Sequence, residues 1–143
     1  MMIPIIVASI LFFDQLTKFL ATKLLPLNAP VSIIDKFFYL TLVRNKGAAF
    51  GILKDQVVFF ILVTLAAIAI IALSLKGKDK PRLYKIALGF MLAGAIGNLI
   101  DRVFFGYVID FLDFRVWPVF NIADSFVTIG AVIFGYFTLF KKQ

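Results

Sequence analysis

The chain of 143 residues contains no cysteine, no histidine and no glutamate, so all eight of its acidic residues are aspartates. Without cysteine it can form neither a disulfide nor a thiolate that acts as nucleophile or metal ligand. Without histidine it lacks the usual acid–base group of neutral pH and the commonest metal ligand. The acid–base chemistry open to this chain therefore falls to aspartates, and we expect neither a metal nor another cofactor.

Long hydrophobic runs dominate what is present, because 62% of the residues are hydrophobic and the mean hydropathy is +1.02. A soluble domain averages roughly 45–50% apolar residues, so this composition indicates an integral membrane protein. Four stretches come close to the ~20 residues that cross a bilayer: residues 3–25, 57–75, 84–105 and 122–140. Because a spanning segment must satisfy its own backbone hydrogen bonds, we expect four helices.

These spans predict a mainly α, integral membrane fold, a four-transmembrane-helix bundle in one domain over residues 1–143. The spans leave two segments, 26–56 and 106–121, on one side of the membrane. Within the first, the run Phe37–Val43 is rich in the aromatic and β-branched residues that are typical of strands. Residues 45–47 then supply turn chemistry. We therefore expect a small sheet between the first and second spans.

The basic residues predict how the bundle is oriented. They crowd the connection between the second and third spans and the end of the chain: Lys76, Lys78, Lys80, Arg82 and Lys85, with Lys141 and Lys142. Such a loop is typically cytoplasmic, and an even number of spans places both termini beside it. The net charge of +7 could also indicate nucleic acid, but the basic residues form no long basic face. We expect contact with membrane lipid and no nucleic-acid partner.

Two aspartates lie where hydrophobic segments meet their polar edges. Asp124 comes three residues after Asn121, which is placed as the N-cap of the last span, and Asp110 lies in the preceding outward segment. A segment of this length lets Asp110 fold back toward Asp124. Two carboxylates at one site do not both ionise easily, so one holds a proton while the other acts as base. Such a pair can activate water for peptide hydrolysis at the lipid–water boundary.

Other interpretations of the polar residues stay open. Asp124 could serve only as an acid that caps its helix. The remaining polar residues of the spans share helix faces, Asp14 with Lys18, and Asn98 with Asp101 and Arg102. The four charged residues among them could be charge-neutralising contacts in a membrane scaffold. They could also form the pathway of a small ion or proton carrier, because ionisable residues inside a membrane mark such pathways. Against the carrier, the span 57–75 contains no ionisable residue.

Five sequence blocks occur in order across nearly the whole chain: DQLTK at 14–18, RNKGAAFG at 44–51, GAIGNLIDR at 94–102, VIDF at 108–111 and FNIADS at 120–125. Together they resemble the lipoprotein signal peptidases, or signal peptidase II, a family of bacterial membrane aspartyl proteases. The resemblance implies a four-helix membrane bundle with a small outward-facing β-cradle and a short outer helix. It also implies that both termini are cytoplasmic, in the bacterial cytoplasmic (inner) membrane, with the active site near the outer face.

The resemblance further implies a substrate and site residues. The substrate would be a prolipoprotein whose cysteine bears a diacylglyceryl group, cut just before that cysteine, and the inhibitor would be globomycin. Asp110 and Asp124 correspond to the catalytic dyad. The residues that correspond to substrate-binding positions are Asn45, Asn98, Arg102 and Asn121, and those at supporting positions are Asp14, Lys18, Gly47, Asp101, Val108 and Ala123. We expect the protein to act as a monomer.

Overall fold

The computed structural model describes residues 2–47, 55–77 and 80–140. This part of the chain forms four long helices, α1 (Met2–Leu24), α2 (Val57–Leu75), α3 (Arg82–Phe105) and α4 (Ile122–Phe140). All four are long and apolar enough to cross a membrane. Their bounds differ from the predicted spans by one residue at each end of α1 and by two at the start of α3. The predicted four-helix, multi-pass membrane fold is confirmed.

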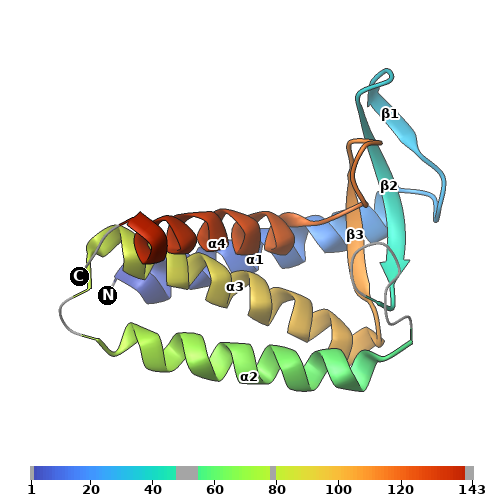
Figure 1. Ribbon diagram of the computed structural model, residues 1–143. Coiled ribbons are helices and arrows are strands. Elements are labelled where there is room, and N and C mark those ends of the chain that lie inside the picture. Colours follow the sequence, from blue (N-terminus) through green and yellow to red (C-terminus); the bar gives the residue numbers. More distant parts are fainter. Residues whose placement is uncertain (1, 48–54, 78–79, 141–143) are drawn as a thin grey trace.

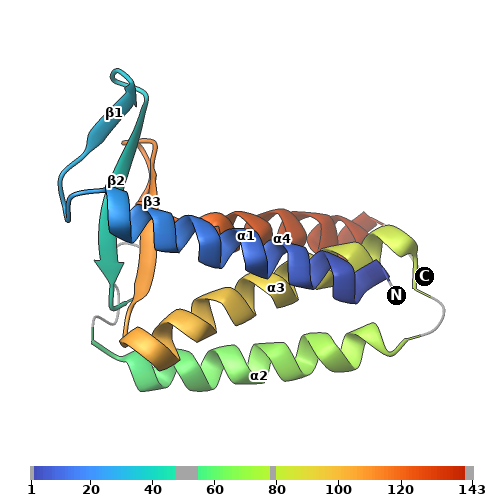
Figure 2. The ribbon, with the colours of Figure 1, turned by 180° about the vertical axis from the view of Figure 1, so that it is seen from behind.

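Helix α3 is the centre of the bundle, and α1, α2 and α4 all pack against it. The two views in Figures 1 and 2 show α2 along one side of α3 and the pair α1 and α4 along the other. Glycines allow the close approach. A Cβ atom on Gly94 would overlap the carbonyl oxygen of Ala123, and one on Gly97 would lie 2.6 Å from a carboxylate oxygen of Asp14. Small residues on α3 therefore bring α1 and α4 within reach of its polar side chains.

A three-stranded antiparallel sheet stands across one end of the helices, while α1 begins and α4 ends at the opposite end (Figures 1 and 2). Its strands are β1 (Val31–Ile34), β2 (Phe38–Asn45) and β3 (Val108–Asp113), in the order β1-β2-β3. The first two strands confirm the predicted sheet between the first and second spans. The third was not predicted, because the sequence placed Asp110 only in the outward segment 106–121, whereas this residue lies in the middle of β3.

The chain enters β3 directly from α3. Gly106 ends the helix with φ of 74°, and its N–H donates to the carbonyl oxygen of Arg102 at 3.1 Å. Glycine adopts this left-handed conformation without the strain that a side chain would cause. An apolar cluster of Ala21, Leu42, Ile109 and Phe111 then packs the end of α1 against β2 and β3. The sheet is therefore fixed to the helices at the point where β3 carries Asp110.

The outer helix implied by the family resemblance is not found within residues 2–47, 55–77 and 80–140. Residues 48–51, which complete the second sequence block, lie outside the described residues.

Candidate active site

Asp110 and Asp124 line the same cavity, which has a volume of about 250 Å³. Asp110 comes from β3 and Asp124 from the first turn of α4. The other lining residues are Asn45, Gly47, Asn98, Arg102, Val108, Trp117, Pro118, Val119, Phe120, Val127 and Thr128. Two segments that are separate in the sequence thus bring both carboxylates to one cavity, together with most of the residues expected to bind substrate.

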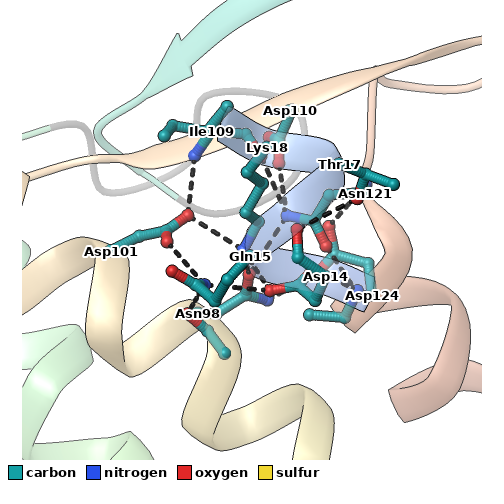
Figure 3. A network of polar contacts seen from close by, with 12 residues as sticks. Asp14, Gln15, Thr17, Lys18, Asn98, Asp101, Ile109, Asp110, Asn121 and Asp124 are labelled. Atoms are coloured by element: carbon teal, nitrogen blue, oxygen red, sulfur yellow. Dashed lines mark hydrogen bonds and ion pairs between the residues drawn. The ribbon is translucent and has the colours of Figure 1, made fainter. Parts of the chain in front are cut away.

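Amide groups surround both carboxylates. Asp110 accepts a hydrogen bond from the side chain of Asn45 at 2.9 Å on one oxygen. Its other oxygen accepts from the side chain of Asn121 at 2.8 Å (Figure 3). Asp124 accepts from the side chain of Asn98 at 2.7 Å and from the backbone N–H of Asn121 at 3.3 Å. Each carboxylate oxygen therefore has one amide donor. Amides hold the carboxylates in place without adding charge to a site with little water.

Asn121 ties together three elements. Its side-chain oxygen accepts the N–H of Asp124 at 2.8 Å, so the two residues cap α4 reciprocally and the predicted N-cap is confirmed. Its Nδ2 donates to Asp110 of β3, to the carbonyl oxygen of Ile109 at 3.3 Å, and to Asn98 of α3 at 3.0 Å. Asn121 is fully buried, so it lies behind the cavity wall rather than on its surface.

Burial and the negative charge of Asp124 raise the pKa of Asp110 from 3.8 to about 7. The hydrogen bonds from Asn45 and Asn121, and then the charge of Lys18, oppose this rise but do not cancel it. A carboxyl group that titrates near neutral pH can hold a proton at one moment and release it at another. The carboxylate pair is therefore able to carry a single proton at physiological pH.

A buried cluster of charges is linked to Asp124 through the side chain of Asn98. The ammonium nitrogen of Lys18 is 2.9 Å from a carboxylate oxygen of Asp14 and 2.9 Å from one of Asp101. It also donates to the side-chain oxygen of Asn98 at 3.1 Å. Asp14, Lys18 and Asp101 are each at most 1% exposed. The contact expected between Asp14 and Lys18 is confirmed.

Asp101 and Arg102, neighbours on α3, have different surroundings. Asp101 pairs with Lys18 of α1. The guanidinium carbon of Arg102 lies 5.2 Å from the centre of the Phe60 ring of α2, and the residue lines the cavity. A guanidinium stacks favourably on an aromatic face. One N–H of Arg102 donates to the carbonyl oxygen of Asn98 at 3.5 Å.

Sequence reasoning missed several residues of this region. Gln15 donates to Asp14 at 3.1 Å, to Asp101 at 3.2 Å and to the Gly97 carbonyl oxygen at 3.3 Å, and its place inside the first sequence block was the available signal. Val127 and Thr128 follow Asp124 by three and four residues, the spacing that places side chains on one helix face. Phe120 lies inside the fifth sequence block, which was the available signal for it, whereas the lining residues 117–119 lie outside the five blocks.

Comparisons with known proteins agree with the sequence blocks. A family model described as signal peptidase (SPase) II matches residues 6–140. The chain is 48% identical over 138 residues to a lipoprotein signal peptidase of Caldanaerobacter subterraneus subsp. tengcongensis, covering 96% of this chain and 95% of that protein. It is 42% identical over 132 residues to one of Halothermothrix orenii, covering 92% and 91%.

The fold also matches solved structures. A bacterial membrane enzyme solved by the in meso method at 2.3 Å resolution superposes with a TM-score of 0.88 and 33% identity, covering 99% of this chain and 92% of that one. A second structure with the same description, at 1.9 Å resolution, gives a TM-score of 0.87 and 33% identity, covering 99% of this chain and 94% of that one.

Proposed function

This chain belongs to the signal peptidase (SPase) II family, and on that premise we propose that it is a membrane aspartyl endopeptidase with Asp110 and Asp124 as its catalytic dyad. Its family makes it a protease that cleaves the signal peptides of lipoproteins. The proposed substrate is a diacylglyceryl-modified prolipoprotein, and the proposed cut lies just before the lipid-modified cysteine. The main observation in support of the proposal is that Asp110 and Asp124 line the same cavity.

In the proposed reaction the dyad starts with one proton, held by Asp110, whose pKa is raised to about 7. Asp124 takes a proton from water as the water oxygen attacks the scissile carbonyl carbon, and Asp110 gives its proton to the carbonyl oxygen. The resulting diol collapses as the C–N bond breaks. The proton on Asp124 passes to the leaving nitrogen, and the diol returns one to Asp110. The dyad ends as it began, and neither a metal nor a covalent intermediate takes part.

The substrate contacts that we propose come from the polar side of the cavity. Asn45 and Asn98 already orient the carboxylates, and each lines the cavity, where it could also meet the substrate backbone. The N–H groups of Arg102 fit a carbonyl or ester oxygen of the substrate. Val108 and Val127 give the same cavity an apolar side. We propose that globomycin competes for this cavity and that the enzyme acts as a monomer.

The proposed orientation follows from the two ends of the bundle. The cavity lies at the sheet end, while the basic connection between α2 and α3 lies at the other end, where α1 begins and α4 ends (Figure 1). Lys80, Arg82 and Lys85 of the described residues belong to that connection or to the start of α3. The positive-inside rule supports cytoplasmic termini and an active site at the outer face of the inner membrane.

A gel-shift assay with purified enzyme and lipidated precursor tests the dyad. Asp110→Asn and Asp124→Asn should each lower turnover by at least about 10²–10⁴-fold, because each removes an acid–base group. Asp35→Asn makes the same chemical change at an exposed aspartate outside the cavity and should cut like the wild type. Wild-type turnover should persist in EDTA and stop with globomycin. Near-normal turnover by either dyad variant would refute the assignment.

A further inference from the structure

Two buried carboxylates hold the backbone immediately before each proposed catalytic aspartate (Figure 3). Asp14 of α1 accepts the N–H of Ala123, the residue before Asp124, at 2.8 Å. Asp101 of α3 accepts the N–H of Ile109, the residue before Asp110, at 3.0 Å. Ala123 belongs to α4 and Ile109 to β3, so each carboxylate reaches from one element to the backbone of another.

Lys18 connects these two carboxylates. In Figure 3 its side chain reaches between Asp101 and Asp14, with its ammonium nitrogen 2.9 Å from an oxygen of each. Two anions side by side in a site with little water repel each other strongly, and an ammonium between them removes that repulsion. Lys18 therefore fixes how far apart Asp14 and Asp101 lie, and through them how far apart the backbones at Ala123 and Ile109 lie.

Lys18 also sets the orientation of one of the amides at the dyad. Its ammonium can only donate, so the atom of Asn98 that faces it at 3.1 Å must be the side-chain oxygen. The Nδ2 group of Asn98 then points to Asp124, to which it donates at 2.7 Å. Replacing Lys18 would thus alter the position of Asp124 in two ways, through the amide of Asn98 and through the backbone at Ala123.

We propose that Asp14, Lys18 and Asp101 are positioning residues that set the separation of Asp110 and Asp124. This inference rests on the proposed function, because it assigns the cluster a part in the same reaction. None of the three lines the cavity, so they do not touch the substrate. Their loss should therefore lower kcat by a larger factor than it raises KM. A displacement of about 1 Å at reacting groups costs about 10²-fold in rate.

The first test uses charge compensation. The wild-type cluster carries one net negative charge, Lys18→Met leaves two, and Lys18→Met combined with Asp14→Asn restores one. We expect Lys18→Met to lower kcat by about 10²-fold, and the double variant to recover part of that loss. Lys23→Met removes an equal charge from an exposed position on the same helix and should match the wild type. Wild-type kcat in Lys18→Met, or losses that multiply in the double variant, would overturn the proposal.

The second test needs no unpaired charge and so remains informative if Lys18→Met does not fold. Asp14→Asn keeps a side-chain oxygen that can accept the N–H of Ala123, while Asp14→Leu keeps the branched shape of the side chain, in a larger volume, and has no acceptor. We expect the leucine variant to lose much more kcat than the asparagine variant, with KM changing by a smaller factor than kcat. Equal kcat in the two variants would overturn the proposal.

Asp110→Asn in the same assay distinguishes failure of the proposed function from failure of the positioning role alone. If Asp110→Asn cuts normally, the proposed function fails. If Asp110→Asn is inactive while Lys18→Met and Asp14→Leu turn over like the wild type, only the positioning role fails.

Discussion

Replacing Asp110 by asparagine separates the cost of burying this carboxyl group from its proposed use in catalysis. Asp110 is 1% exposed, and burial together with the charge of Asp124 raises its pKa from 3.8 to about 7. Between these two values the folded chain holds a proton at Asp110 that the unfolded chain has already released. The contribution of Asp110 to stability is therefore complete below pH 3.8 and is lost as the pH rises to about 7.

The size of this loss follows from the two pKa values. The gap from 3.8 to about 7 covers about three pH units at about 1.4 kcal/mol each, or about 4 kcal/mol. Asparagine has no proton to lose, so Asp110→Asn avoids this penalty. Relative to the wild type, the variant should gain up to about 4 kcal/mol between pH 4 and pH 8, which corresponds to roughly 10 °C in Tm.

Thermal unfolding in detergent at pH 4 and at pH 8 measures this gain. Asparagine also places an N–H₂ group against the amides of Asn45 or Asn121, but that cost is the same at both pH values and cancels in the comparison. Asp35→Asn controls for loss of a carboxylate at an exposed position. We expect a variant that is more stable at pH 8 and inactive. If the difference in Tm between Asp110→Asn and the wild type is the same at both pH values, Asp110 is not a buried titrating carboxyl and its role as the acid of the dyad loses its physical basis.

Two further predictions concern packing and orientation. Gly94→Ala should destabilise the bundle by about 1–3 kcal/mol, because its Cβ atom would overlap the Ala123 carbonyl oxygen. Gly135→Ala, with open space around it, should leave the stability unchanged. Equal Tm values for the two variants would contradict the close α3–α4 contact. Because the chain has no cysteine, single cysteines can report sidedness without background. In intact spheroplasts an impermeant maleimide should label Ser32→Cys in β1 and leave Lys80→Cys unlabelled, and the reverse pattern would overturn the proposed orientation.

The helices could be predicted from the sequence because hydropathy and length are local properties. Strand β3 could not, for a physical reason. Its residues Val108–Phe111 are all buried, so it lacks the alternation of buried and exposed positions that marks a half-buried strand. Its hydrogen-bond partner is β2, where Asn45 pairs with Val108 and Val43 with Asp110. A strand whose partner is more than sixty residues away in the sequence is specified by tertiary contacts rather than by its own pattern.

For the candidate site, the sequence indicated which residues belong to the site, but it did not indicate all of their partners. Helical spacing predicted the contact between Asp14 and Lys18 within α1. It could not show that Asp101 takes the same lysine as its partner, because that contact joins two helices and depends on how closely they pack at Gly97. The backbone N–H groups that donate to Asp14 and Asp101 are likewise determined by tertiary packing.

Asn121 couples the first turn of the last helix to the geometry around Asp110. The same side chain that starts α4 also donates to β3 and to α3. A newly made chain whose last segment has not yet entered the bilayer would lack both Asp124 and one of the two side-chain donors, Asn121, that orient Asp110. With Asp110 and Asp124 as the proposed dyad, hydrolytic capacity would then appear only when membrane insertion is complete, which would protect neighbouring nascent proteins from a half-assembled protease.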